Sequence, residues 1–211
     1  MLNSQCKICR RQGLKLFLKG EKCLSPKCTL VKRPNPPGPG QKKKRRHRSI
    51  SEYGQELGEK QKLKNWYNLS ERQLKNYVKR VLEKRGRVED PTILLIKNLE
   101  TRLDNAVYRL GFAQSRDQAR QLVSHRHFLV NGKPVNIPSY QVKKGDSIAL
   151  SPTRTKKIIY QNLPTLLKKH KAPSWLELNL EKLEGKVVGE PSFEESAPPA
   201  EIPAIFEYYS R

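Results

Sequence analysis

Four cysteines near the start of the chain are the residues best suited to coordination chemistry. Cys6 and Cys9 form a C-x2-C pair, and Cys23 and Cys28 form a C-x4-C pair. Two thiolates at either spacing can bind one tetrahedral ion, and the loop between the pairs has the size found in zinc fingers. Since four sulfurs would fill the coordination sphere, the sequence predicts one structural zinc ion with no open position for a substrate. Reduced or redox-active thiols are the alternative; an iron–sulfur cluster fits the ligands but has no redox partner in this sequence.

Basic side chains gather on a second stretch, SRDQARQLVSHRHFLVNGKPV, at residues 115–135. The basic side chains are those of Arg116, Arg120, His125, Arg126, His127 and Lys133. Arg116 and Arg120 stand four residues apart on a predicted helix, where like charges repel by roughly 0.2–0.5 kcal/mol. Phosphate oxygens between them, with Lys133 reaching from a hairpin, would convert this repulsion into charge-assisted hydrogen bonds. The two histidines either donate to such an anion or are satisfied or exposed side chains without that role, and both alternatives stay open.

A third group of cations follows a Pro/Gly segment, in PNPPGPGQKKKRRHR at residues 34–48. The four prolines at its start forbid a helix, so we expect an extended segment that becomes ordered only against a partner. The residues predicted to bind an anionic polymer here are Lys42, Lys43, Lys44, Arg45, Arg46 and Arg48. A solvated tail or a localisation signal is the alternative.

The charge of the whole chain points to the same kind of partner. The 211 residues include 43 Lys and Arg against 20 Asp and Glu, which gives a net charge of +23 at pH 7. Phosphate polymers bind such surfaces through counterion release, although some basic proteins are merely soluble. No apolar run approaches the roughly 20 residues of a membrane span, and the first residues lack the apolar core of a secretory signal. We therefore expect a cytosolic protein, whose reducing surroundings favour a metal site over disulfides.

Helical periodicity predicts the elements that carry these groups. Residues 51–85 are predicted to be helical, with a capping box formed by Ser70 and Gln73. Residues 98–111 form a further predicted helix. Ser115 would then cap the helix that carries Arg116 and Arg120.

Strand signals follow that helix. Asn131-Gly132 between two apolar segments is a strong signal for a type I′ hairpin. The stretch KKGDSIAL predicts a turn at Gly145-Asp146 and a strand that ends near Leu150. Alternation in WLELNL at residues 175–180 predicts another strand, and the Pro/Glu-rich residues 189–204 are predicted to form a surface loop.

These elements predict an α+β fold with several parts. Residues 1–48 form the zinc segment and its basic extension, and residues 49–96 a helical domain. Residues 97–150 form a compact helix–helix–hairpin module, near the lower size limit for an independent core. Residues 151–189 add strands and a helix.

Several stretches match one known family in order and spacing. They are CKICRRQGLKLFLKGEKCLSPKC with RPNPPGPGQ, EKQKLKNWYNLSERQLKNY, LETRLDNAVYRLGFAQSRDQARQLVSH, VNGKPVNIPSY and the terminal EYYSR. Together they resemble the S-four (S4) family of small-subunit ribosomal proteins, bacterial type, nearly end to end. Residues 97–150 resemble the RNA-binding module named after that family. Many members have glycine at the position of Arg126, which permits a positive φ; Arg126 makes that turn costlier or changes it.

The resemblance implies a primary binder of small-subunit (16S-type) rRNA in its five-prime domain. Such a protein nucleates subunit assembly and contributes to translational accuracy near the point where mRNA enters. Its implied partners are the neighbouring ribosomal proteins S-three and S-five, with mRNA as a further partner. The implied location is the ribosome of the bacterial cytosol, with an organelle ribosome as the alternative.

The resemblance also implies site residues and an arrangement of the tail. The RNA-facing residues of the family's module correspond here to Arg116, Gln118, Arg120, His125, Asn131 and Lys133. The zinc ligands carried by some members correspond to Cys6, Cys9, Cys23 and Cys28. The tail, residues 190–211, is expected to pack on the helical domain.

Two other functions share parts of this pattern. An RNA-modifying enzyme or a synthetase fragment can carry the same module, but it needs a separate catalytic domain, and no nucleophile with a paired base stands out here. A zinc-containing nucleic-acid-binding regulator would need a recognition helix after its last cysteine, where PNPPGPG stands instead. We therefore predict a ribosomal protein that is not an enzyme.

Overall fold

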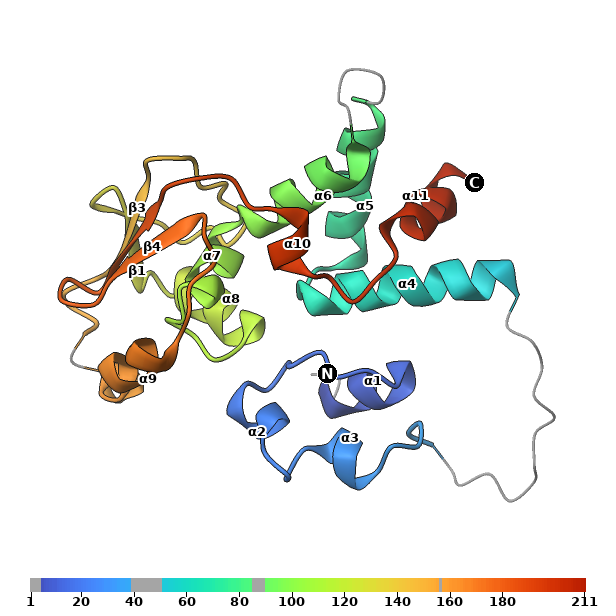
Figure 1. The fold of residues 1–211 in the computed structure, drawn as a ribbon, viewed down its shortest axis with the longest axis horizontal. Helices are drawn as coiled ribbons and strands as arrows, with labels where there is room; N and C mark the ends of the chain where they lie inside the picture. The colour runs from blue at the N-terminus through green and yellow to red at the C-terminus, as the bar shows by residue number, and fades with distance from the viewer. Residues whose placement is uncertain (1–4, 39–50, 85–89, 156) are drawn as a thin grey trace. The chain divides into compact units, whose positions relative to one another are not determined.

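The computed structural model of this chain describes residues 5–38, 51–84, 90–155 and 157–211 (Figure 1). Contacts divide the chain into two compact units. The helical unit comprises Met1–Lys84 and Pro198–Arg211, and the sheet unit comprises Arg85–Ala197. Helices and one antiparallel sheet are both present, which confirms the predicted α+β class. Within the described ranges, we find no helix with the length and apolar character needed to span a membrane.

The helical unit is built on α4 and α5, both of which begin at a serine cap. Its helices are α1 (Gln5–Gln12), α2 (Glu21–Leu24), α3 (Thr29–Lys32), α4 (Glu52–Trp66), α5 (Glu71–Leu82) and α11 (Ile202–Ser210). The hydroxyl of Ser51 accepts the N–H of Gly54 at the start of α4. At α5 the predicted capping box is confirmed: Ser70 and Gln73 each bond the other's backbone N–H. These caps satisfy backbone donors that a helix start otherwise leaves unpaired.

A buried lysine anchors the C-terminal helix α11 beside α4. Lys60 is 4% exposed; its Nζ lies 2.7 Å from Glu71 Oε1 and 4.2 Å from the centroid of the Tyr208 ring. The Tyr209 hydroxyl donates to the same Glu71 carboxylate at 2.9 Å. Burial opposes the charge of Lys60, but its bonds to Glu71 and Tyr208 outweigh burial and raise its pKa. The C-terminal residues 198–211 thus belong with the helical unit.

The sheet unit begins with two helices where the sequence predicted one. Helix α6 (Pro91–Glu100) starts at Asp90, whose carboxylate accepts the N–H of Thr92 at 2.7 Å. Helix α7 (Leu103–Arg109) follows after a break at Arg102. The predicted single helix over 98–111 was therefore wrong. The break has a tertiary cause, because the backbone there pairs with a distant segment: Leu103 N–H donates to the Tyr140 carbonyl at 2.8 Å.

Among the described residues, five short strands form one antiparallel sheet in the order β2-β1-β3-β5-β4. They are β1 (Phe128–Val130), β2 (Lys133–Pro134), β3 (Ser147–Leu150), β4 (Leu176–Asn179) and β5 (Glu184–Val187). Asn131 and Gly132 both have positive φ, 51° and 78°, as the predicted type I′ turn requires. The predicted strands at Ser147–Leu150 and Leu176–Asn179 are also confirmed.

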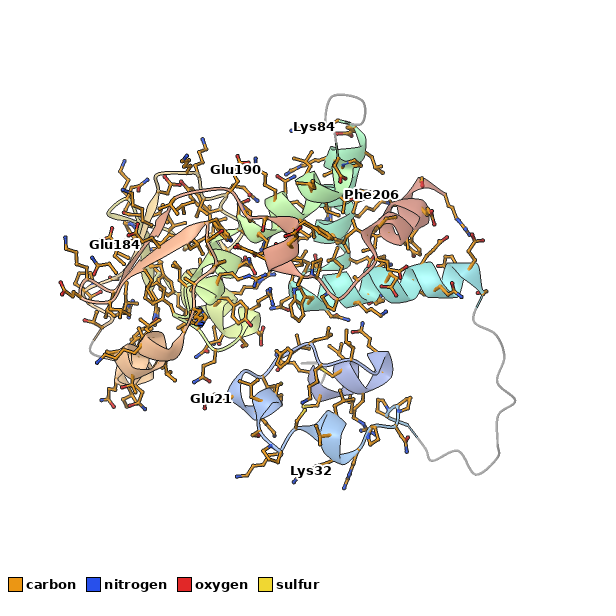
Figure 2. All side chains as sticks on the ribbon, viewed as in Figure 1. Glu21, Lys32, Lys84, Glu184, Glu190 and Phe206 are labelled. Atoms are coloured by element: carbon orange, nitrogen blue, oxygen red, sulfur yellow. The ribbon has the colours of Figure 1, made fainter. Side chains whose placement is uncertain are left out.

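Helices cover this sheet and close its core. Helix α8 (Arg116–Ser124) packs against α7 (Figure 1). The remaining elements are the short helix η1 (Ile158–Tyr160), α9 (Leu163–Lys169) and α10 (Phe193–Ser196). Helix α10 lies in the stretch 189–204 that was predicted to be a surface loop, and it packs against α6. An ion pair lies nearby: Lys97 Nζ of α6 is 2.6 Å from Glu190, which is labelled in Figure 2. Fully buried Leu103, Leu110, Phe128 and Ile148 lie in one core cluster.

Gly185 of β5 is a position where the core leaves no room for a side chain. A Cβ there would lie 2.4 Å from Cδ1 of the fully buried Leu110. We predict that Gly185→Ala lowers the free energy of unfolding by about 1–3 kcal/mol, since overpacking forces a rigid neighbour to move. The measurement is chemical denaturation of the full chain. Gly189→Ala is the matched control, because its nearest atoms are 3.7 Å away; equal stability of the two variants would contradict the prediction.

Candidate nucleic-acid interface and metal centre

The sequence predicted that Arg116 and Arg120 form a pair on the surface of α8, and the structure differs from this at Arg116. Ser115 caps the helix as expected, accepting the N–H of Gln118. Arg116, however, is only 7% exposed. Its Nε donates to Asn105 Oδ1 at 2.8 Å, and its guanidinium carbon lies 4.6 Å from the centroid of the Tyr108 ring. Arg116 therefore lies inside the unit.

The other predicted residues of α8 have mixed environments. Gln118 is half-buried, and its Oε1 accepts the N–H of Gln114 at 2.8 Å. Arg120 is half-buried, whereas His125, at the end of the helix, is exposed. The cation face of α8 thus consists of Arg120 and the exposed residues at its C-terminal end.

Helix α8 ends in a left-handed turn at an arginine. Arg126 has φ +57°, its N–H donates to the Val123 carbonyl at 2.9 Å, and the N–H of His127 donates to the Leu122 carbonyl at 3.1 Å. This pair of bonds is a Schellman motif, whose left-handed position favours glycine. The turn is thus retained despite the side chain, and the exposed Arg126 adds a cation at this end of α8.

His127 is a buried structural residue, which decides between the two alternatives left open for it. It is 4% exposed, and its Nδ1 lies 2.7 Å from the Tyr160 hydroxyl. Burial lowers the pKa of His127, and the nearby Lys157 and Arg154 charges lower it further. Burial raises the pKa of Tyr160. Both shifts favour the neutral forms, so the imidazole and the phenol share an uncharged hydrogen bond.

The hairpin carries two of the predicted RNA-binding residues, Lys133 and Asn131, and Asn131 also has a structural role. Lys133 on β2 is exposed. Asn131 is also exposed, but its amide donates to Asp146 Oδ1 at 2.8 Å and its Oδ1 accepts the N–H of Ser147 at 2.9 Å. These bonds join the hairpin to the turn that precedes β3.

Two cations at that turn were missed by the sequence analysis. Lys143 and Lys144 are exposed, and Lys143 N–H donates to Asp146 Oδ2 at 2.8 Å. Because Asp146 also binds Asn131, the structure brings this turn beside the hairpin that carries Lys133. The two lysines were visible in KKGDSIAL but were interpreted only as part of a turn. The basic run Lys42–Arg48 lies outside the described residues.

The four cysteines lie on three short helices of the helical unit. Cys6 and Cys9 are on α1, Cys23 is on α2, and Cys28 caps α3. All four thiols are free, and all but Cys6 are buried. Burial raises the pKa of the Cys9 thiol, and the other three sulfurs raise it further, so Cys9 lies within electrostatic range of each of them. The Lys19 N–H donates to Cys23 Sγ at 3.4 Å.

The predicted metal centre is not formed as these side chains stand. Throughout the part of the chain that the structure describes, no three Cys, His, Asp or Glu side chains make a group that could hold a metal ion. Spacing along the chain indicates which sulfurs can share an ion, but not whether the helices bring them to ligand distance. The donor set itself suits zinc, since four free and mostly buried thiols need no disulfide partner and face little competition from water.

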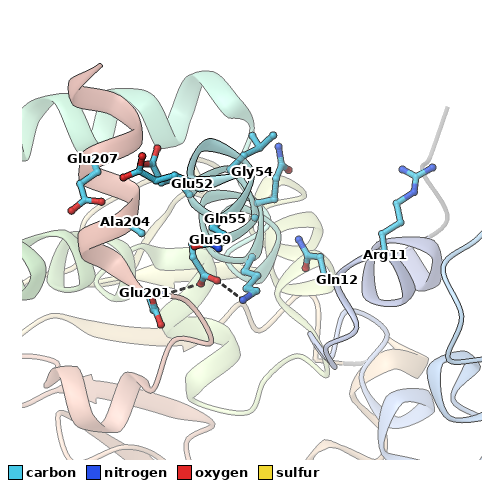
Figure 3. Close-up of a pocket in the computed structure, with 14 residues that line it drawn as sticks. Arg11, Gln12, Glu52, Gly54, Gln55, Glu59, Glu201, Ala204 and Glu207 are labelled. Carbon is cyan, nitrogen blue, oxygen red and sulfur yellow. Dashed lines mark hydrogen bonds and ion pairs between the residues drawn. The ribbon is translucent and has the colours of Figure 1, made fainter. Parts of the chain in front are cut away.

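An acidic pocket of about 820 Å³ on the helical unit contrasts with the basic surfaces (Figure 3). Its lining includes the glutamates Glu52, Glu56, Glu59, Glu201 and Glu207. Lys62 and Arg11 are the cations among the lining residues. The buried Glu56 accepts a hydrogen bond from Arg211 at 2.8 Å. Because carboxylates repel phosphates, this pocket is unsuited to RNA.

Comparison with known proteins agrees with both units. The family model described as ribosomal protein S4/S9 N-terminal domain matches residues 1–97, and the S4 domain model matches residues 101–148. Small ribosomal subunit protein uS4 of Thermus thermophilus is 48% identical over 208 residues, covering 98% of this chain and 96% of that protein. The chain belongs to the uS4 family. The uS4 proteins of Caldicellulosiruptor bescii and Clostridium tetani are 44% and 46% identical, covering 100% and 99% of this chain and 98% and 97% of theirs.

Membership of the uS4 family decides between the function classes. It is a family of ribosomal proteins, so the alternatives of an RNA-modifying enzyme and of a zinc-containing regulator are not supported. The S4 domain match spans α7, α8 and the hairpin, which carry Arg120, His125, Arg126 and Lys133.

The left-handed backbone conformation of Arg126 makes it possible to test whether the turn after α8 is strained. We predict that Arg126→Gly raises the free energy of unfolding by about 1 kcal/mol relative to Arg126→Ala, because glycine adopts positive φ without the Cβ clash. Both variants lose the cation, so only the backbone conformation distinguishes them. Chemical denaturation of the two variants measures the difference; an alanine variant as stable as the glycine variant would show that the turn is not strained.

Proposed function

We propose that the chain is a structural protein of the small ribosomal subunit and a primary binder of 16S-type rRNA in its five-prime domain. The observation that carries this proposal is the match to uS4 proteins over 98% of the chain. The exposed cations of the sheet unit and the net charge of +23 support it. Since the relatives are bacterial uS4 proteins, the proposed location is the ribosome of the bacterial cytoplasm.

Binding would rest on the basic side chains of the sheet unit that reach solvent. Arg120 and His125 come from α8, Lys133 from the hairpin, and Lys143 and Lys144 from the adjoining turn. Lysine and arginine bind phosphate oxygens and release counterions. Side chains cannot read the narrow major groove of A-form RNA, so such a surface recognises the shape of a folded RNA through its backbone and 2′-hydroxyl groups. The basic run Lys42–Arg48 would strengthen the electrostatic attraction to RNA phosphates.

The same proposal extends to assembly and to protein neighbours. An early rRNA binder nucleates subunit assembly and, beside S-three and S-five, contributes to accuracy where mRNA enters the subunit; mRNA would be a further partner. The acidic pocket supports the proposal that the helical unit has a surface that contacts other proteins, because its glutamates repel RNA and attract basic protein groups.

We further propose that Cys6, Cys9, Cys23 and Cys28 bind one structural zinc ion. Four free thiols on α1, α2 and the start of α3 support it, as does the N–H donated to Cys23. The ion would supply the positive charge that keeps buried thiolates deprotonated. It would also cross-link three short helices that have little core of their own.

The rRNA proposal predicts a preference that depends on specific surface cations. The full-length protein should bind a five-prime-domain rRNA transcript more tightly than a scrambled RNA of the same length at physiological salt. Arg120→Ala with Lys133→Ala should weaken this binding by about tenfold or more and reduce the salt dependence by about two ions, since two phosphate contacts are lost. Filter binding across a salt series measures both quantities.

A charge-matched variant controls for general electrostatics. Lys171→Ala with Lys182→Ala removes two exposed cations that lie outside α8, the hairpin and the turn before β3. It should leave the preference for rRNA intact. Equal binding of the wild type to both RNAs, collapsing together as salt rises, would reduce the protein to a generic polycation and overturn the proposal.

The zinc proposal predicts one zinc ion per chain in protein purified without added metal. Cys6→Ser with Cys28→Ser should lose that ion, because each cysteine pair is then broken. Elemental analysis by mass spectrometry measures the content. Ser25→Ala, which removes a hydroxyl between Cys23 and Cys28 without touching a thiol, should keep the zinc. Wild type that remains zinc-free after incubation with Zn²⁺, and shows no thiolate-to-metal band with Co²⁺, would refute the site.

A further inference from the structure

A buried chain of hydrogen bonds connects three helices of the sheet unit. Glu100, at the end of α6, is fully buried and accepts two bonds from Arg109, each 2.9 Å long. The Nδ2 of Asn105 on α7 donates to Glu100 Oε2 at 2.8 Å and to the Glu100 carbonyl at 3.1 Å. The Oδ1 of Asn105 accepts from Arg116 Nε at the start of α8, at 2.8 Å. One carboxylate is thus connected to Arg116 through a neutral amide.

Glu100 determines the direction of the hydrogen bonds in this network. An ionised carboxylate only accepts hydrogen bonds, so the amide of Asn105 must direct its Nδ2 toward Glu100. Its Oδ1 then faces Arg116, and a flipped amide would lose both contacts. The guanidinium is a rigid planar fork, so a bond to its Nε and a ring packed 4.6 Å away determine its orientation.

The position of Arg116 is energetically unfavourable for a cation. It is the first residue of α8, where the helix dipole opposes positive charge and favours an anion. It is also buried, and burying a guanidinium costs free energy that an apolar side chain would avoid. A cation held there by a dedicated amide indicates a task beyond packing. The half-buried Arg120 on the same helix and the exposed Arg126 just beyond its end indicate that the task concerns the same anionic ligand.

We propose that Glu100 and Asn105 are positioning residues for RNA binding, which hold Arg116 so that its charge contributes to phosphate binding at the start of α8. This inference rests on the proposed rRNA binding. Tyr108 assists by packing its ring against the guanidinium. The amide sets the direction of Arg116 without neutralising it, which a carboxylate in its place would do.

The test is a double-mutant cycle on rRNA affinity and its salt dependence. Asn105→Ala and Arg116→Ala should each weaken binding of the five-prime-domain transcript by about tenfold and lower the salt dependence by about one ion. The double variant should bind no more weakly than Arg116→Ala alone, because Asn105 acts through Arg116. Additive losses in the double variant would overturn the inference.

Controls separate positioning from stability. Ile148→Val removes a methylene from the core of the same unit without touching the network, so it should lower the melting temperature but leave the salt dependence unchanged. Tyr108→Leu leaves the bonds of Asn105 intact and provides a second variant should Asn105→Ala not fold. It should also weaken binding and reduce the salt dependence. A melting temperature lowered without change in affinity or salt dependence would make Asn105 purely structural.

Arg120→Ala distinguishes failure of this inference from failure of the proposed function. If the wild type prefers rRNA and Arg120→Ala weakens binding, while Asn105→Ala and Tyr108→Leu bind like the wild type, only the positioning inference fails. If the wild type itself shows no preference for rRNA over the scrambled RNA, the proposed function fails and the inference with it.

Discussion

The sheet unit depends on charged side chains that are fully buried where α6 passes into α7. Glu100 binds Arg109 and Asn105, and two residues later Arg102 makes a bidentate pair with Asp104, at 3.0 and 2.6 Å. Removing one partner of a buried pair leaves an uncompensated charge and costs about 3–5 kcal/mol. The bonds of Glu100 and Asn105 thus join α6 to α7, and Asn105 joins α7 to Arg116 of α8.

The two units have different charge arrangements, which suit different partners. The sheet unit exposes cations on α8, the hairpin and the turn before β3. The helical unit buries Lys60 against Glu71 and the tyrosines of α11, and glutamates line a pocket on it. It also exposes cations, among them Arg72, Lys75 and Lys79 on α5. A strongly basic protein can thus offer both an RNA-binding surface and an acidic surface suited to basic proteins.

Local signals in the sequence predicted much of the fold. The capping box of Ser70 and Gln73, the Asn131-Gly132 turn and the strand at Leu176 depend on residues that are neighbours along the chain, and all three are confirmed. The candidate site was predicted less well. Arg116 was expected on the surface, but its partner Asn105 lies on another helix, and no local pattern indicates such a contact. The exposed Lys143 and Lys144 lie beside the hairpin because Asp146 of their turn binds Asn131.

The sequence by itself determined the charge, the cysteine spacing, the helix caps and the hairpin type, because composition and short-range backbone preferences need no knowledge of the fold. Only the tertiary structure decided which cations reach solvent, where the helix over 98–111 breaks, and that α10 forms and packs against α6. Those outcomes depend on pairing between segments far apart in the chain, such as Leu103 with Tyr140. Burial and long-range hydrogen bonds then override the local preference of each residue.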